Sequence, residues 1–280
     1  MPEPIKVIIV GRPSSGKTCL LHDWPFPHIC IDADGKMMNL KYLMRDRIKL
    51  REIKSYDDFD YTDMENIQWI RAKTQSFDST YTNLRDILRD PPMNKETGEA
   101  GTFSMDSLTS LADSAINYGL MQRSGAAGKS MGIVPIPDLP EWLGESMFLS
   151  SLFTDVQHLP CNVVLTAHMV ITERETMGSK GKPGVTKVTK QLMTGGTKIG
   201  NKIPVYFSEV WNAQAIPNLE AGGPPDRKLY TVITEECDFV RTKLPLPPVI
   251  DYTYKYDDPP ESLWSVVNKA REEAERLMNG

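Results

Sequence analysis

Short apolar runs alternate with longer amphipathic segments along the chain, which predicts buried strands flanked by helices. Strands are predicted for residues 7–10, 27–32, 49–53, 102–106, 161–168, 203–211, 228–234 and 239–243. Helices are predicted for residues 36–44, 79–88, 108–121, 141–158 and about 261–279, whereas residues 67–70 fit either a strand or a helical turn. This alternation is typical of an α/β fold with a mostly parallel central sheet flanked by helices.

The first apolar run leads directly into a phosphate-loop motif. Residues 11–18, GRPSSGKT, match G-x-x-x-x-G-K-[ST] at every fixed position, with a strand before them and a short helix after them. Backbone N–H groups of such a loop surround the β-phosphate, its lysine contacts the β- and γ-phosphates, and the hydroxyl at its end is a ligand of Mg²⁺. We therefore predict that ATP and Mg²⁺ bind at Gly11, Arg12, Pro13, Ser14, Ser15, Gly16, Lys17, Thr18 and Cys19.

Two later strands are predicted to end in acidic residues. Asp34 follows the second strand and is the candidate base for the attacking water, with Asp32 as the reserve. One of the two alternatively caps the helix that follows. Asp106 ends the strand of residues 102–106, where it would orient Mg²⁺ together with Thr18, although it also fits an N-cap position.

Composition limits the class of protein. The chain has 280 residues, of which 40% are hydrophobic, and this is enough for one domain over residues 1–280 with a sizeable core. No apolar run approaches the length of a membrane span, and the N-terminus lacks the features of a signal peptide, so we expect a cytoplasmic protein with no membrane partner. The four cysteines show neither metal-ligand spacing nor a disulfide framework.

The charge of the chain is uneven. The formal net charge is −5, yet residues 176–202 contain six lysines and no acidic residue. Six glycines in the same segment predict a flexible loop that orders on a polyanion, with a solvated surface loop as the alternative. The lysines are Lys180, Lys182, Lys187, Lys190, Lys198 and Lys202.

Other polar residues also occupy suggestive positions. His168 ends the strand of residues 161–168 and could sense the γ-phosphate, although a lone histidine is often structural. Residues 122–140 form a second glycine-rich segment, which we expect to be a mobile loop. Arg241 and Lys243 would share one face of a strand and could reach a phosphate of a neighbouring subunit, or pair with surface acids.

Taken in order, these motifs resemble the RecA-like ATPase core over roughly residues 5–243. The nearest resemblance is to short, phage-encoded RecA-like ATPases associated with single-strand annealing and recombination. It implies that Asp34 activates water, that Asp106 orients the metal and that His168 is the sensor. It further implies two DNA-binding loops, at residues 123–138 and 176–199, and trans-acting cations at Arg241 and Lys243. The usual glutamate is replaced by the shorter Asp34, and no N-terminal polymerisation domain precedes Lys6.

The sequence thus favours an Mg²⁺-dependent, DNA-stimulated ATPase that binds single-stranded DNA. The resemblance implies a homo-oligomer, either a ring or a filament, with a single-strand DNA-binding protein as a further partner. The alternatives are a P-loop kinase of a small metabolite, in which the basic segment would be a lid, and a nucleotide-dependent packaging or scaffold ATPase. The basic segment contains lysines but no arginine, which favours DNA over a phosphate-binding lid.

Overall fold

The structure is a computed structural model, and it is built around one large sheet. It describes residues 3–21, 24–36, 50–53, 69–73, 77–94, 97–127, 138–176, 185–194, 197–217, 228–234, 242–252 and 262–279. In this part of the chain, ten strands form one sheet in the order β10-β9-β8-β1-β6-β5-β2-β4-β3, with β7 paired to β6 outside that path. The strands are β1 (Lys6–Gly11), β2 (His28–Asp32), β3 (Leu50–Ile53), β4 (Trp69–Lys73), β5 (Thr102–Asp106), β6 (Asn162–Thr176), β7 (Val185–Leu192), β8 (Glu209–Pro217), β9 (Lys228–Ile233) and β10 (Val249–Asp251).

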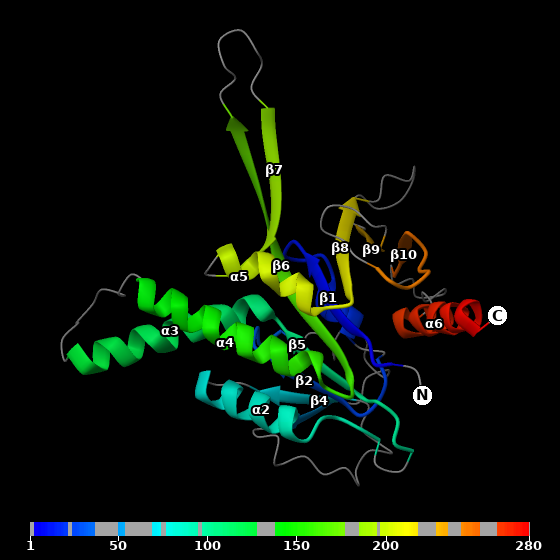
Figure 1. Ribbon diagram of the computed structural model, residues 1–280, viewed down its shortest axis with the longest axis horizontal. Coiled ribbons are helices and arrows are strands. Elements are labelled where there is room, and N and C mark those ends of the chain that lie inside the picture. Colours follow the sequence, from blue (N-terminus) through cyan, green and yellow to red (C-terminus); the bar gives the residue numbers. More distant parts are fainter. Residues whose placement is uncertain are drawn as a thin grey trace.

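Most of these strands are parallel. Among the described residues, the seven strands from β8 to β3 pair in parallel, whereas β9, β10 and β7 add antiparallel pairs. The helices are η1 (Lys17–Leu21), α2 (Phe77–Arg89), α3 (Leu108–Ala127), α4 (Leu139–Gln157), α5 (Thr197–Lys202), η5 (Ile203–Tyr206) and α6 (Leu263–Asn279). The predicted α/β fold with a mostly parallel sheet and flanking helices is therefore confirmed (Figure 1). One domain over residues 1–280 stays a prediction.

The central strand β1 divides the core into two clusters. Ile8 and Val10 pack in the cluster under α2, α3 and α4, whereas Val7 and Ile9 pack in the cluster under η1 and α6. This division follows from the period of two along a strand, which sends successive side chains to opposite faces. A strand buried on both faces loses the polar alternation of an exposed strand, which explains the continuous apolar run at residues 7–10.

Most predicted elements occur at or near their predicted positions. The helix predicted for residues 108–121 continues as α3 to Ala127, so the first part of the predicted mobile loop is helical. Residues 128–137 of that loop lie outside the described residues, and so do residues 37–44 of the helix predicted for residues 36–44. Of the predicted residues 67–70, Trp69 and Ile70 lie in strand β4, and residues 67–68 lie outside the described residues. The helix predicted from residue 141 begins at Leu139.

The prediction of a flexible basic loop over residues 176–202 was wrong for its described parts. Strand β6 runs on to Thr176, and β7 returns antiparallel to it, from Met169 paired with Leu192 to Thr176 paired with Val185. This two-stranded ribbon extends away from the body of the protein (Figure 1). The reason lies in the alternating, β-branched sequence VTKVTKQL of β7, which favours a strand despite the neighbouring glycines.

The C-terminal part also differs from the prediction. Residues 203–206 form the 3-10 helix η5, and the predicted strand begins only at Glu209, as β8. Lys243 lies in a turn and not in a strand, and Arg241 lies outside the described residues. Strand β10 was missed because its three residues follow a proline-rich passage. No helix in the described chain is long and apolar enough to cross a membrane.

Candidate nucleotide-binding site

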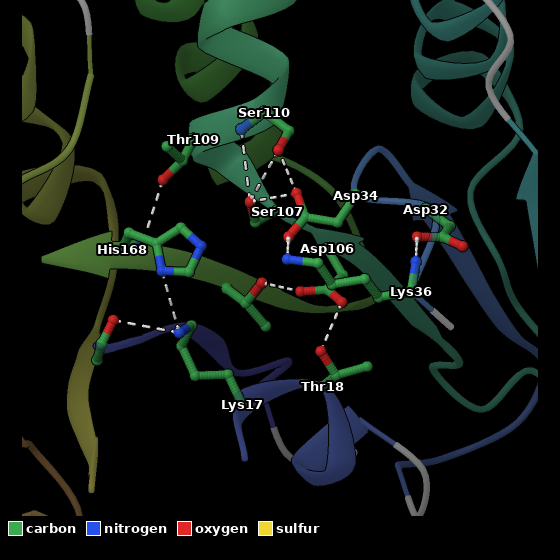
Figure 2. A network of polar contacts seen from close by, with 12 residues as sticks. Lys17, Thr18, Asp32, Asp34, Lys36, Asp106, Ser107, Thr109, Ser110 and His168 are labelled. Carbon is green, nitrogen blue, oxygen red and sulfur yellow. Dashed lines mark hydrogen bonds and ion pairs between the residues drawn. The ribbon is translucent and has the colours of Figure 1, made fainter. Parts of the chain in front are cut away.

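The predicted nucleotide-site residues meet at one edge of the sheet. Gly11 pairs with His168 in the register of β1 and β6, and Asp32 pairs with Asp106 in the register of β2 and β5. Since these strands are parallel, their carboxyl ends share an edge, which is where α/β sheets bind ligands. Figure 2 shows Lys17, Thr18, Asp34, Asp106 and His168 converging there.

The backbone of the phosphate loop needs small residues at two positions. Gly16 has a φ of +83°, a left-handed conformation that L side chains rarely adopt. A Cβ atom on Gly11 would lie 2.4 Å from the Ala213 carbonyl oxygen and 2.5 Å from Ser15 Oγ. The Ser15 hydroxyl is buried and has no hydrogen-bond partner among the residues that the structure describes. A tight turn with an unsatisfied buried donor is compatible with a bound phosphate.

Lys17 is buried and faces the loop's own carbonyl groups. Its Nζ donates to the carbonyl oxygens of Gly11 (3.1 Å) and Arg12 (2.9 Å). Burial lowers the pKa of Lys17 to about 8, although the negative charges of Asp106 and Asp34 raise it in part. An incompletely solvated ammonium gains more from a phosphate than a solvated one, so this lysine is well placed for a triphosphate.

Asp106 and Thr18 form the candidate magnesium site. The Thr18 hydroxyl donates to Asp106 Oδ2 at 2.7 Å, and the Thr166 hydroxyl donates to Oδ1. Burial raises the pKa of Asp106, while the two hydroxyl donors lower it in part. These oxygen ligands fit Mg²⁺, which takes one or two protein ligands and completes its shell with water and substrate phosphates. Accordingly, the described residues contain no cluster of three or more His, Cys, Asp or Glu side chains suited to a metal.

The cap of helix α3 is a different residue from the one considered in the sequence. The Ser110 N–H donates to Ser107 Oγ at 3.4 Å, so Ser107 is the N-cap of α3. The carboxylate of Asp106 accepts from threonines instead. Asp106 is therefore free of a capping role and remains the candidate metal-orienting acid.

Asp34 is held beside Asp106 by its backbone and its side chain. The Asp34 N–H donates to the Asp106 carbonyl oxygen at 2.9 Å. Its Oδ1 accepts from the hydroxyls of Ser107 (2.8 Å) and Ser110, and its Oδ2 pairs with Lys36 at 3.3 Å. Burial raises the pKa of Asp34, but these hydrogen bonds and the Lys36 charge outweigh it, so the net pKa is lowered.

Asp32 has a different role from Asp34. Its Oδ1 accepts the backbone N–H of Lys36 at 3.1 Å, and its side chain is buried in the described structure. The carboxylate thus stabilises the turn that carries Asp34. The helix that one of the two acids was expected to cap lies outside the described residues from residue 37 on, so that alternative stays a prediction. The contact with Lys36 leaves Asp34 as the better placed candidate base.

His168 connects the phosphate loop with helix α3. Its Nδ1 lies 3.3 Å from Lys17 Nζ, and its backbone N–H donates to Thr109 Oγ1 at 3.0 Å. Because an ammonium is only a donor, this contact requires Nδ1 to be unprotonated. Burial and then the Lys17 charge lower the pKa of His168, which favours the same neutral form.

Several polar contacts of the site were not predicted. Thr166, Ser107, Ser110 and Thr109 hold the side chains or backbones of the predicted residues. The run of hydroxyl residues after Asp106 was a usable signal, since DSLTS begins a helix at the ligand edge. Thr166 lies inside an apolar strand, and Tyr252, which contacts the loop, lies 237 positions from Ser15. No local pattern marks those two residues.

The predicted cations lie away from this edge. Lys187 and Lys190 occupy β7, Lys198 and Lys202 occupy α5, and Lys180 and Lys182 lie outside the described residues. The Lys243 N–H donates to the buried Glu209 at 2.9 Å, and Glu209 begins β8. Since Glu209 pairs with Val7 near the start of β1, Lys243 lies at the edge opposite to the phosphate loop.

Cys19, the last predicted nucleotide-binding residue, supports the loop. Its backbone N–H donates to the Gly16 carbonyl oxygen at 2.9 Å, which begins η1. Burial raises the pKa of its thiol, so this cysteine stays protonated. We therefore assign Cys19 a role in the loop through its backbone and no role for its thiol in the reaction.

Comparison with known proteins gives the family. A family model described as "AAA domain" matches residues 3–243. No curated protein matches the chain. Among solved structures, the crystal structure of the flagellar accessory protein FlaH from Methanocaldococcus jannaschii aligns with a TM-score of 0.42 and 8% identity, over 94% of this chain and 89% of that chain. This likeness is too distant to carry an argument. Because the family model covers most of the chain, and its phosphate loop is complete, the protein belongs to the AAA-domain family of P-loop ATPases.

Proposed function

We propose that this ATPase binds single-stranded DNA in recombination or annealing, and that ATP controls its grip on the DNA. The observation that carries the proposal is the continuity of β6 between the nucleotide site and the basic ribbon. His168 contacts Lys17 at the phosphate edge, and the next residue, Met169, begins the ribbon pairing. A change in the phosphates at Lys17 would therefore act directly on the base of the ribbon.

The ribbon is long enough to reach a ligand beyond the sheet. At about 3.3 Å per residue, the strand from Met169 to Thr176 extends about 25 Å past the site. The Met193 N–H donates to the His168 carbonyl oxygen at 2.8 Å, which closes the base of the ribbon. A two-stranded ribbon is only marginally stable in water by itself, so a bound polyanion would stabilise it.

The chemistry of the return strand and the helix after it favours phosphates. Strand β7 and helix α5 carry Lys187, Lys190, Lys198 and Lys202 and no acidic residue. The outer half of strand β6 carries both positively and negatively charged residues, in the sequence TERET. We therefore place the DNA contact on β7, α5 and the lysines Lys180 and Lys182 between the two strands.

The nucleotide site supplies the other half of the proposal. Mg²⁺, bound by Thr18 and oriented through water by Asp106, would neutralise charge on the β- and γ-phosphates. Lys17 would bind the same phosphates, and Asp34 would orient the attacking water. The contacts of Asp34 with Ser107 and Ser110 fix its carboxylate for that role. His168 would respond to loss of the γ-phosphate through Lys17.

We further propose a homo-oligomer, either a ring or a filament. Lys243 lies at the sheet edge opposite to its own phosphate loop, so a phosphate that it contacted would belong to the site of another subunit. Arg241 would act with it. A single-strand DNA-binding protein is the expected partner, and the cytoplasm of a bacterial host, with the chain encoded by a phage, is the expected setting.

Salt titration of DNA binding tests the proposal. If six lysines contact phosphates, the log-log slope of single-strand affinity against salt is at most about −4 per protomer, at about −0.7 per neutralised phosphate. Replacing Lys180, Lys182, Lys187 and Lys190 by Ala should flatten the slope by more than half. The matched control removes four cations from α2 and α6, as R85A, R89A, K269A and R276A, and should keep the slope.

Two outcomes would contradict the proposal. Unchanged salt-dependent binding in the four-lysine variant would remove the ribbon from the DNA contact. The second outcome is that the wild-type protein has no affinity for DNA and that the four-lysine variant turns over nucleotide slowly. This result would instead support a metabolite kinase in which the basic segment is a lid.

A further inference from the structure

A pair of tyrosines from the C-terminal strands packs against the phosphate loop. The Tyr252 hydroxyl donates a hydrogen bond to the carbonyl oxygen of Ser15. The rings of Tyr230 and Tyr252 lie 5.9 Å apart between centroids, with planes inclined at 45°. The Tyr252 N–H also donates to the Tyr230 carbonyl oxygen at 3.0 Å. Two side chains remote in sequence therefore form one unit against the loop.

This unit closes directly on Gly16. A Cβ atom at Gly16 would lie 2.7 Å from the Tyr252 hydroxyl oxygen and 3.0 Å from Cδ1 of Tyr230. The glycine of the motif is thus required on two counts, by its φ of +83° and by the tyrosines packed against it. Burial raises the pKa of Tyr252, so its hydroxyl remains a donor at all ordinary pH values.

The hydrogen bond fixes the orientation of one peptide group. The Ser15 carbonyl and the Gly16 N–H belong to the same planar peptide, and in a trans peptide they point in opposite directions. With the oxygen held toward Tyr252, the N–H must point away from the tyrosines. If this peptide turned over, its carbonyl oxygen would face the phosphate and repel it.

We propose that Tyr252 is a positioning residue for nucleotide binding, whose hydroxyl holds the Ser15–Gly16 peptide with its N–H toward the β-phosphate. Tyr230 holds the Tyr252 ring in place. The proposal concerns the phosphate loop of the P-loop ATPase and does not depend on DNA binding. It also gives the antiparallel strands β9 and β10 a function, because they carry the pair to the loop.

The test compares Tyr252→Phe with the wild-type protein, using pyrophosphate as the probe because it has no base or sugar. The variant keeps the ring and loses only the hydroxyl. We expect about threefold to tenfold weaker pyrophosphate binding, the range of one hydrogen bond, with the fold retained and the unfolding midpoint only slightly lowered. The control Tyr206→Phe removes a hydroxyl from a ring that packs on Phe153, away from the loop, and should bind normally.

A spectroscopic measurement separates positioning from a general loss of stability. In protein labelled with ¹⁵N-glycine, pyrophosphate should shift the Gly16 amide resonance of the wild type and shift it much less in Tyr252→Phe. Wild-type affinity together with a wild-type shift in the variant would overturn the proposal. Weaker adenosine binding with normal pyrophosphate binding would also overturn it, because the tyrosine would then contact the base.

Discussion

Lys17 is the residue on which nucleotide binding should depend most. Its Nζ donates hydrogen bonds to carbonyl oxygens of the loop, and bound phosphates would replace these carbonyl groups as acceptors. We expect Lys17→Ala to abolish ATP hydrolysis and to weaken triphosphate binding by at least tenfold, without loss of the fold. Calorimetric titration with ATP and a thermal unfolding curve check the two parts. A variant that hydrolysed ATP at the normal rate would contradict the assignment of the loop.

The lowered pKa of Lys17 predicts a pH dependence of ATP binding. Phosphate favours the charged ammonium, and burial lowers the pKa of Lys17 to about 8 in the free protein. Affinity should therefore be complete below pH 8 and fall by up to tenfold per pH unit above it. Lys17→Arg is the control, since a guanidinium stays charged over this range and its affinity should not fall. A wild-type dissociation constant that stayed level from pH 7 to pH 10 would contradict the prediction.

The roles of Asp32, the last residue of β2, and of Asp34 can be separated by substitution. We expect Asp34→Asn to bind ATP and to lose turnover, because an amide cannot accept a proton from water. Asp32→Asn should change mainly stability, since Asp32 accepts the Lys36 N–H in the turn. Single-turnover hydrolysis of bound ATP distinguishes them. An active Asp34→Asn with an inactive Asp32→Asn would reverse the assignment.

The role of Asp106 can be tested through the Mg²⁺ dependence of ATP hydrolysis. Its hydrogen bond from Thr18 places the carboxylate beside the predicted Mg²⁺ ligand. We expect Asp106→Asn to raise the Mg²⁺ concentration needed for half-maximal hydrolysis. A Mg²⁺ titration identical to that of the wild type would remove Asp106 from the metal site.

At the level of residues, sequence reasoning found the groups that come from local motifs. The phosphate loop and Asp34 follow predicted strands, Asp106 and His168 end predicted strands, and all of them reach one edge. The supporting residues Thr166 and Tyr252 could not be found in this way. Their contacts depend on which strands are neighbours, and that order is a property of the whole sheet.

Among the elements, η1 is anchored by a single large side chain. Trp24 is buried between Trp211 of β8 and Trp264 of α6, at centroid distances of 6.3 and 5.4 Å. Its Nε1 donates to the Leu20 carbonyl oxygen at 2.9 Å, which fixes the end of η1. Trp24 thus joins the phosphate-loop helix to the C-terminal part of the chain.

We expect Trp24→Ala to lower the free energy of unfolding by about 3–5 kcal/mol, the usual cost of emptying a buried aromatic site. Denaturant titration measures this loss. Leu143→Ala, at an exposed position on α4, is the control and should change stability by less than about 0.5 kcal/mol. Equal effects of the two substitutions would contradict the packing described for Trp24.

Two elements were predicted incorrectly where the sequence contains patterns that favour different structures. In residues 185–192, the alternating β-branched residues favour a strand, whereas the lysines and glycines around them favour a loop. The start of α4 was missed although Asp138 and Glu141 form a capping box, with the Asp138 N–H donating to Glu141 at 2.8 Å. The alternation in residues 185–192 and the capping box at Asp138 and Glu141 are both present in the sequence.

For the molecule as a whole, the order of motifs predicted the architecture better than any single segment did. Alternating strands and helices gave the parallel sheet and its ligand edge. The continuation of β6 beyond that edge could not be foreseen, because its outer half is polar and its pairing with β7 joins segments that no local pattern connects. It is this continuation that joins the nucleotide site to the lysine-bearing ribbon.

ATP hydrolysis measured with and without single-stranded DNA tests this connection most directly. We predict that DNA raises the steady-state rate of the wild type severalfold, and that the variant with Lys180, Lys182, Lys187 and Lys190 replaced by Ala keeps the basal rate and loses the stimulation. A wild-type rate that single-stranded DNA leaves unchanged at saturating ATP and Mg²⁺ would contradict the coupling of the phosphate loop to DNA.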